Sequence, residues 1–441
     1  MKVVFFVHCF FPAHYYGTET YTLELAKHYQ AMGVDVQVVT AIFPGEPAAA
    51  DFVTHYEFQG IPVTCIDKNR LPNTRIKDTY YQPDMRPVLE KILRDSRPDI
   101  VHVTHLINHT ASLLEVTQAL GIATYATFTD FFGFCYNNKL EAADGSLCAG
   151  PSPNRTNCMA CHLKDAGQQA GASRLLRWAS PAQRAPWAAK IANLARKFPP
   201  LRGGPVDGLL EDLSRRPDTL FSLYSAYREV VTPSLFLRNA YASNGFTMPM
   251  RSIRFGVDIA RHAKPERPAG HRPVIGFIGQ LARHKGTDIL IEAFKRLPKQ
   301  SAELRIYGPQ DQDFAYMEHL RRLAAGHAVD FPGTFAKEKM REILDSFDVL
   351  VIPSRWYENS PLVLLNSLAS HTPVIISDVA GMTEFLDEGQ NGFAFQRGSV
   401  DDLERVLGQA LKDTDKLFGL SKSTQYERTP STMATETLAI Y

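Results

Sequence analysis

An apolar strand, a polar loop and a proline-led helix follow one another in the C-terminal half of the chain, and this pattern constrains the fold most strongly. The apolar run 349–352 predicts a buried strand, and the polar loop 354–359 follows it. Ser360 is expected to be the N-cap and Pro361 the first residue of a helix. A second apolar strand is expected at 373–376. Strand, loop, helix and strand in this order form a βαβ unit of a parallel sheet.

The N-terminus of the expected helix faces the carboxyl ends of the strands, where unpaired N–H groups and the helix dipole favour an anion. Two acidic residues, Glu358 and Glu384, flank this end. We interpret the arrangement as a site for a sugar nucleotide. The alternative for Glu358 is an acidic residue at a helix start that only complements the dipole.

The same stretch resembles the signature of the retaining glycosyltransferases of family four, which have the two-domain GT-B fold. That signature has two glutamates eight positions apart around a proline-led helix, then a strand, a glycine turn and a third glutamate. The positions that match it are Glu358, Pro361, Thr372, Pro373, Val374, Gly381 and Glu384. The positions that differ are Asn366 in place of the second glutamate, His371 in place of a glycine and Ala380 in place of the first turn glycine.

Length and composition indicate a two-domain globular protein. The chain has 441 residues, which suits two domains of about two hundred residues each. A net charge of +1 gives no global field that would attract nucleic acid. No apolar run is long enough for a membrane span, and the N-terminal segment lacks the features of a signal peptide. We therefore expect a cytoplasmic protein.

The resemblance covers nearly the whole chain and implies an α/β GT-B fold with two Rossmann-like domains that face each other across a cleft. We expect an acceptor domain at 1–258, with a cysteine-rich loop and a basic helical insert at 135–205. A nucleotide-sugar domain is expected at 259–415, and a C-terminal helix at 416–441 that returns to the first domain.

The loop 8–18 after the first expected strand lies over the ligand crevice in a doubly wound sheet. Gly17 is its one glycine and would allow a substrate to approach the backbone closely. A tight turn is the alternative explanation. The family usually has two adjacent glycines here, and Tyr16 occupies the first position.

Asp130 follows the expected strand 123–128. Family members usually have His-Asp at this point, with the histidine close to the transferred sugar, and Thr129 occupies the histidine position. Asp130 could equally cap the next segment. His102 and His105, at the end of the expected strand 100–104, are interpreted as polar core residues.

Four cysteines lie within 27 residues: Cys135, Cys148, Cys158 and Cys161. Four thiolates can enclose one zinc ion, and a cytosolic setting disfavours disulfides. We expect a structural zinc, with disulfides or plain thiols as alternatives. Cys9 and Cys65 lie in or beside apolar strands and are expected to be inert core thiols.

The segment 164–205 has eight basic residues against one acid, with aromatic and aliphatic residues between them. Such a segment either docks on its own domain as a surface insert or lies on an anionic membrane surface. Peripheral contact with the inner face of a membrane is thus one alternative.

The loop 279–286 carries two glycines and three potential cations, which suits the two phosphates of a nucleotide sugar. The family usually has an arginine after the first glycine and a lysine before the last. Lys285 matches, whereas Gln280 does not, so Arg283 is expected to supply the missing charge. Ser360, Pro361, Leu362 and Asn366 complete the expected nucleotide-sugar site.

As the resemblance implies, the expected reaction is retaining transfer of a hexosyl unit from a UDP- or GDP-linked sugar to a hydroxyl of a saccharide or lipid-linked acceptor, in bacterial cell-surface polysaccharide or glycolipid synthesis. Asp130, Lys285 and Glu358 are the expected catalytic residues. The alternatives are a catalytically weak nucleotide-sugar-binding subunit and a nucleotide-sugar epimerase on the same fold.

Overall fold

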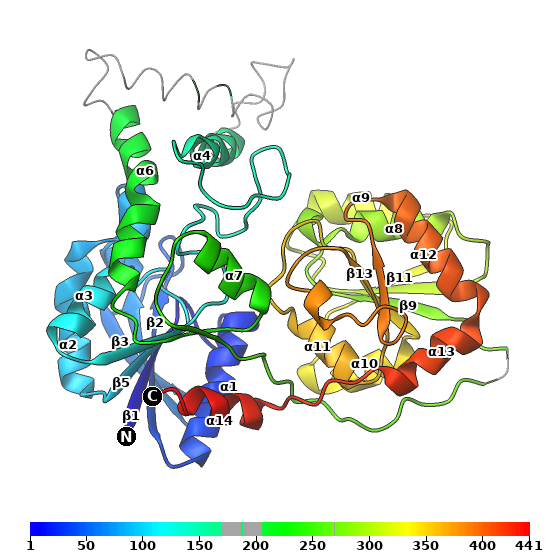
Figure 1. Cartoon of the computed structure of the whole chain (residues 1–441), viewed down its shortest axis with the longest axis horizontal. Coiled ribbons are helices and arrows are strands. Elements are labelled where there is room, and N and C mark those ends of the chain that lie inside the picture. The colour runs from blue at the N-terminus through cyan, green and yellow to red at the C-terminus, as the bar shows by residue number, and fades with distance from the viewer. Residues whose placement is uncertain (170–186, 188–189, 191–204, 269) are drawn as a thin grey trace. The chain divides into compact units, whose positions relative to one another are not determined.

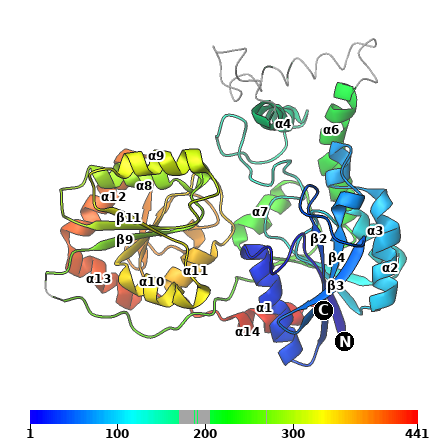
Figure 2. The same ribbon diagram turned by 180° about the vertical axis from the view of Figure 1, so that it is seen from behind.

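The computed structural model describes residues 1–169, 187, 190, 205–268 and 270–441. The chain divides into two compact units, each built around one sheet (Figures 1 and 2). The first unit comprises Met1–Arg254 with Ser431–Tyr441, and the second comprises Phe255–Pro430.

Eight strands form the sheet of the first unit, in the order β3-β4-β2-β1-β5-β6-β7-β8. All neighbouring strands are parallel except β3 and β4, which are antiparallel. The strands are β1 (Lys2–Phe6), β2 (Asp35–Ile42), β3 (Val53–Phe58), β4 (Ile61–Asp67), β5 (Ile100–Val103), β6 (Ala123–Thr127), β7 (Val230–Thr232) and β8 (Met250–Ser252). The sequence pattern did not predict β3, because its residues are half-buried and polar side chains alternate along this edge strand.

Helices cover both faces of this sheet, with α2 and α3 on one side and α1 and α14 on the other (Figures 1 and 2). The helices are α1 (Gly17–Ala31), α2 (Arg86–Ser96), α3 (Ser112–Ala119), α4 (Thr156–Gln169), α6 (Pro205–Tyr224), α7 (Leu235–Ser243) and α14 (Pro430–Leu438). The short 3-10 helices are η1 (Lys68–Arg70), η2 (Ile76–Thr79) and η3 (Pro83–Met85). Two-sided covering explains why β1 is a continuous apolar run, since both of its faces are buried.

The second unit has six parallel strands in the order β11-β10-β9-β12-β13-β14. The strands are β9 (Val274–Ile278), β10 (Glu303–Tyr307), β11 (Val329–Gly333), β12 (Val349–Ile352), β13 (Val374–Ser377) and β14 (Gly392–Phe395). Figure 1 shows α8, α9 and α12 together on one face of this sheet, and α10 and α11 on the other. The helices are α8 (Thr287–Lys295), α9 (Phe314–Ala324), α10 (Met340–Ser346), α11 (Leu362–Ala369), α12 (Val400–Lys412) and α13 (Thr414–Ser423), with 3-10 turns η6 (Arg283–Lys285), η7 (Lys337–Lys339) and η8 (Thr383–Phe385).

The unit boundaries differ from those expected from the sequence. The first crossing lies at Arg254 rather than at 258, and the return crossing lies at Pro430 rather than at 415. The reason is packing: Leu417 and Leu420 of α13 are buried in the core of the second unit. Of the C-terminal segment 416–441, only Ser431–Tyr441, which contains most of α14, belongs to the first unit.

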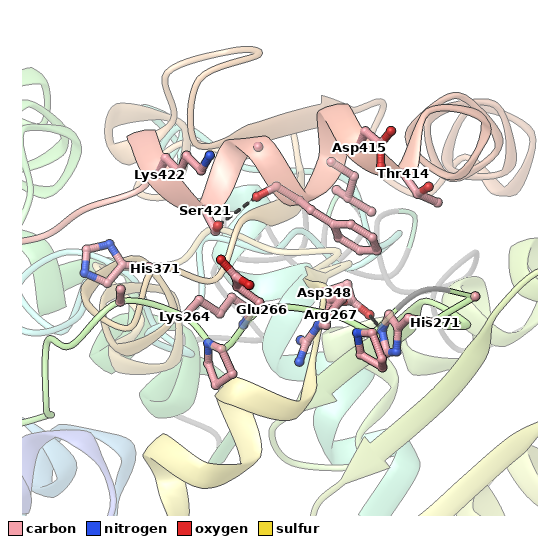
Figure 3. Close-up of a pocket in the computed structure, with 17 residues that line it drawn as sticks. Lys264, Glu266, Arg267, His271, Asp348, His371, Thr414, Asp415, Ser421 and Lys422 are labelled. Carbon is pink, nitrogen blue, oxygen red and sulfur yellow. Dashed lines mark hydrogen bonds and ion pairs between the residues drawn. The ribbon is translucent and has the colours of Figure 1, made fainter.

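A cavity of about 970 Å³ lies in the second unit at the amino ends of the strands, between α13 and the segment before β9 (Figure 3). Three of its charged or titratable groups already contact one another. Arg267 and His271 contact the carboxylate of Asp348 at 2.5 and 2.7 Å. Lys264 donates to the Leu344 carbonyl at 2.7 Å, and burial lowers the pKa of Lys264 to about 7. Because ligand crevices of parallel sheets lie at the carboxyl ends of the strands, this cavity is at the opposite edge from the expected site.

None of the helices in the described ranges is both long and apolar enough to cross a membrane. Most of the basic segment 164–205, including Arg174, Arg177 and Arg184, lies outside the described residues. The expectation of a membrane contact therefore stays a prediction.

The aromatic ring of Tyr441 packs against three rings of the first unit. It lies 5.0 Å from the ring of Tyr125, 5.7 Å from His102 and 6.0 Å from Tyr29. Its hydroxyl contacts Nδ1 of His102 and accepts a hydrogen bond from Tyr29 at 3.3 Å. Burial lowers the pKa of His102 to about 3, so this histidine is a neutral core residue.

We expect Tyr441→Ala to lower the free energy of unfolding by about 3 kcal/mol, because it removes an aromatic ring that packs against three other rings and leaves a cavity. Tyr441→Phe removes only the hydroxyl and should cost about 1 kcal/mol. Urea denaturation of the three proteins measures both differences. An Ala variant as stable as the parent would show that this contact does not hold α14 on the sheet.

Candidate functional site

The strand order of the second sheet reverses between β9 and β12. From β9 the chain continues outward to β10 and β11, whereas β12, β13 and β14 extend the other way. In open parallel sheets the ligand crevice lies at such a switch point, beyond the carboxyl ends of the strands. The loop 279–286 follows β9 and the loop 353–361 follows β12, so both candidate loops leave the sheet at this point.

The two loops touch through Gly286. Its φ of 72° lies in the left-handed region, and a Cβ on this residue would stand 2.0 Å from the carbonyl oxygen of Pro353. Glycine is therefore required here for both conformation and space. The Arg355 N–H donates to the His284 carbonyl at 2.8 Å and joins the loops a second time.

Lys285 and Glu358, the two expected catalytic residues of this unit, form an ion pair with Nζ and Oε1 2.6 Å apart. Ser354 Oγ and Trp356 Nε1 donate to the same carboxylate oxygen at 2.6 and 3.2 Å. The Lys285 ammonium also lies 5.6 Å from the centroid of a Trp356 ring. Three donors thus fix one carboxylate at the switch point.

The carboxylate of Glu358 is charged in this environment. Burial by itself would raise the pKa of Glu358, but the charge of Lys285 and the hydrogen bonds from Lys285, Ser354 and Trp356 outweigh burial. The pKa of Glu358 is therefore below its ordinary value. This position does more than complement the dipole of α11, because its carboxylate orients the loop lysine.

Arg283 lies over the ring of Tyr316, with its guanidinium carbon 5.2 Å from the ring centroid. The Tyr316 hydroxyl donates to Asp288 at 2.9 Å, and Arg355 binds both oxygens of Asp288 at 2.7 and 2.9 Å. Arg283 is exposed in this position.

The start of α11 differs from the expected one. Ser360 has a φ of 59°, and Pro361, not Ser360, is the N-cap, because the Pro361 carbonyl accepts the first helical hydrogen bonds from Leu364 and Leu365. The Ser360 Oγ is buried and has no hydrogen-bond partner within the described structure. A buried hydroxyl without a partner is costly, so a bound ligand at the helix start would compensate it.

Asn366 lies one turn into α11 and is half-buried. Its Nδ2 donates to the Leu362 carbonyl at 2.8 Å, so the amide nitrogen is bonded within its own helix. Leu362 is the first residue of α11, and Glu384 lies in η8.

The first unit has the same topological feature between β1 and β5, since β2 and β4 extend one way and β6 to β8 the other. Asp130, beyond β6, accepts from Nε2 of His105 at 2.8 Å and from the Phe132 N–H at 2.9 Å. The Ile107 N–H donates to Nδ1 of His105, so Nε2 carries the proton that Asp130 accepts. Asp130 therefore caps the next segment with one oxygen and holds a histidine with the other.

Gly17 is the first residue of α1. Its φ is not in the left-handed region, and a Cβ there would meet nothing within 4 Å. Neither a tight turn nor packing requires glycine, and open space remains where a ligand could approach. Thr18 donates to Thr129 at 3.1 Å, which joins the first turn of α1 to the segment that follows β6.

Two family models match the chain, one in each of the two units. Residues 15–141 match the family model Glycosyltransferase Family 4, and residues 258–425 match the model Glycosyl transferases group 1. The chain has the GT-B fold and resembles glycosyltransferase family 4. The GT-B assignment agrees with a TM-score of 0.64 to sucrose-phosphate synthase from Thermosynechococcus elongatus, which is 15% identical, with 100% of this chain and 98% of that chain covered.

Anabaena HepE in complex with UDP and glucose has a TM-score of 0.62 and 16% identity, over 100% of this GT-B chain and 98% of that chain. An uncharacterised glycosyltransferase of Methanocaldococcus jannaschii is 32% identical over 38% of this chain and 44% of its own length. A D-inositol 3-phosphate glycosyltransferase of Nocardia farcinica is 26% identical over 37% of this chain and 40% of its own length. The matched segments thus span less than half of these curated relatives.

The four clustered cysteines of this GT-B chain are all free thiols. Backbone N–H groups of Leu140 and Gly150 point at the sulfurs of Cys135 and Cys148, each at 3.4 Å. Burial raises the pKa of Cys158 and of Cys161 to about 12. Within the described ranges, the one group of metal-ligating atoms that all lie within 4.8 Å of one another does not include these thiols. No three of these thiols therefore meet that spacing in the described structure, although Cys158 and Cys161 interact electrostatically with Cys135 and Cys148, and zinc there stays a prediction.

Sequence reasoning missed Ser354 and Trp356 and interpreted His105 as a core residue. Ser354 and Trp356 precede Glu358 by four and two positions in a loop, and no periodic pattern indicates which loop side chains turn back on a carboxylate. His105 is buried, as expected, but it also contacts Asp130. The sequence did indicate where these loops begin, because each follows an apolar strand, but it did not indicate which loop side chains meet.

The stability conferred by Glu358 should depend on pH. Its folded-state pKa is below its unfolded value of about 4.5, so the stabilisation is complete above that pH and is lost as the pH falls through the folded-state pKa. Glu358→Gln should lower the free energy of unfolding by about 1–3 kcal/mol at pH 7, and the difference from the parent should shrink below about pH 4.5.

Urea denaturation between pH 3 and pH 7 measures this difference. Glu342→Gln is the matched control, because Glu342 is an exposed glutamate of the same unit and should give a small, nearly constant difference. A Glu358→Gln difference that is independent of pH would contradict a charged, paired Glu358.

Proposed function

We propose that the protein is a retaining glycosyltransferase that moves a hexosyl unit from a nucleoside diphosphate sugar to a hydroxyl group of an acceptor. The observation that carries this proposal is the Lys285–Glu358 pair at the switch point of the second sheet, beside the start of α11. The match of both halves of the chain to glycosyltransferase family models supports it.

In the proposed reaction, the bond between the anomeric carbon and the diphosphate oxygen breaks, and the acceptor oxygen bonds to the same face of the sugar. The acceptor proton leaves toward the departing diphosphate. Charge grows on that leaving group, so fixed positive groups beside it lower the barrier. Lys285 and Arg283 would supply these charges, and Glu358 would orient Lys285 and the donor sugar hydroxyls.

A uridine diphosphate donor has the most support, because Anabaena HepE has been solved in complex with UDP and with UDP-glucose. We also propose that Asp130, held by His105, contacts the transferred sugar or the acceptor. Asn366, whose Nδ2 is bonded within α11, would use its amide oxygen toward the donor ribose.

The proposed acceptor is a saccharide or a lipid-linked saccharide of bacterial cell-surface polysaccharide or glycolipid synthesis, at the cytoplasmic side of the membrane. The basic segment would provide the membrane contact.

Lys285→Ala should reduce turnover by about 10²–10³-fold, because it removes one fixed charge next to the leaving group. The measurement is release of UDP from a panel of UDP-sugars, with GDP-sugars in parallel, each with and without saccharide and lipid-linked acceptors. Retention is read from the anomeric configuration of the product by NMR.

Lys295→Ala is the control, since Lys295 lies on α8 of the same unit and pairs with Glu292 at 3.3 Å. It should leave turnover unchanged. Normal turnover in Lys285→Ala would remove Lys285 from the mechanism. Donor binding without release under every acceptor would favour the binding-subunit alternative.

A structural zinc held by Cys135, Cys148, Cys158 and Cys161 is a separate proposal. Its support is four free thiols on one segment, with backbone donors at two of the sulfurs. We expect the Cys158→Ala/Cys161→Ala double variant to contain about one zinc per chain less than the parent, measured by elemental analysis after purification without chelator. Equal zinc content in both proteins would contradict this site.

A further inference from the structure

His8, Cys9 and Glu19 form a compact cluster in the first unit, just beyond β1 and in the first turn of α1. Nε2 of His8 lies 3.2 Å from Oε1 of Glu19, and Sγ of Cys9 lies 3.1 Å from the same oxygen. The ligand atoms of all three residues lie within 4.8 Å of one another. Glu19 is 1% exposed and Cys9 is 3% exposed. Cys9 is a buried thiol, as expected from the sequence, and it also contacts a carboxylate.

We propose that His8, Cys9 and Glu19 bind a divalent transition metal of the zinc type. Imidazole nitrogen, thiolate sulfur and carboxylate oxygen are all zinc ligands, with bonds of about 2.0–2.3 Å. Donor atoms around a tetrahedral ion with such bonds stand roughly 3.3–3.7 Å apart. The separations of 3.1 and 3.2 Å are close to that spacing, so small side-chain movements would complete the geometry.

Hydrogen bonding within the protein does not satisfy this cluster. His8 and Cys9 both meet Oε1 of Glu19, whereas Oε2 of Glu19 and Nδ1 of His8 are buried and have no hydrogen-bond partner within the described structure. A buried carboxylate oxygen without a partner costs free energy. A metal ion held by Glu19 would supply a partner for this carboxylate, and Cys9 would release its proton to solvent on binding as a thiolate.

The position of the cluster indicates what such an ion could bind. Three protein ligands leave the fourth position of a zinc ion open for water or another oxygen donor. The cluster lies at the carboxyl end of β1, next to the switch point between β1 and β5, and the ring of His8 lies 4.3 Å from the ring of His105. The open position would therefore be at the same edge of the sheet as His105 and Asp130.

Cobalt titration tests the site directly, because a thiolate bound to Co²⁺ gives a charge-transfer absorption band. Chelator-treated full-length protein carrying Cys158→Ala/Cys161→Ala, which removes the competing cysteine pair, is titrated with CoCl₂ and then with ZnCl₂. We expect one equivalent of Co²⁺ to produce the band and Zn²⁺ to displace it.

Cys9→Ala and Cys65→Ala, each in that background, form a matched pair, since both remove a buried thiol of the same unit. Cys9→Ala should lose the band, and Cys65→Ala should retain it. His8→Gln keeps the thiol and should weaken Co²⁺ binding at least 10-fold, which provides a second variant if Cys9→Ala does not fold.

Two results would overturn the proposal. One is the absence of a saturable thiolate band in the Cys158→Ala/Cys161→Ala protein. The other is a band that persists in Cys9→Ala or is lost in folded Cys65→Ala, which would place the ion on another thiol.

Discussion

The contact between Gly286 and Pro353 is the constraint on which the candidate site of the second unit depends. A parallel sheet whose strand order reverses at β9 and β12 brings two loops out side by side. They can close on each other only because residue 286 has no side chain, since a Cβ would stand 2.0 Å from a carbonyl oxygen. That approach places Lys285 on one loop within 2.6 Å of Glu358 on the other.

The ion pair has a consequence for ligand binding. Without a ligand, the charge of Lys285 is balanced by a carboxylate that three donors hold in place. A diphosphate arriving at the start of α11 would share the ammonium with Glu358 rather than meet a free cation. Such sharing weakens ground-state binding of the anion but preserves a fixed positive group for the charge that develops on a leaving group. Weaker binding of the ground state with retained stabilisation of a leaving group suits the proposed transfer reaction better than tight binding of a nucleotide.

The first unit repeats the topological principle with different chemistry. Its switch point lies between β1 and β5, and the polar side chains that gather beyond these strands are His8, Glu19, His105 and Asp130. Among the described residues, no lysine or arginine forms a hydrogen bond or ion pair with these four side chains, although the buried Arg216 interacts electrostatically with Asp130. Imidazole and carboxylate groups suit hydroxyls or a metal ion, whereas the cations of the second unit suit phosphates.

The sequence by itself determined the parallel α/β architecture and the loops that carry the site. Apolar runs such as 349–352, each followed by a polar loop and a helix, predict buried strands and place Lys285 and Glu358 just after strand ends. They are visible in the sequence because a strand that is buried on both faces consists of consecutive apolar residues. Only the tertiary structure decided which side chains meet. The pairing of Lys285 with Glu358 and the contacts of His8 and Cys9 with Glu19 depend on contacts between loops or elements. The shift of the N-cap from Ser360 to Pro361 and the assignment of α13 to the second core depend on such contacts as well. Such contacts are set by three-dimensional packing and the need to satisfy buried polar atoms, and local sequence carries little information about either.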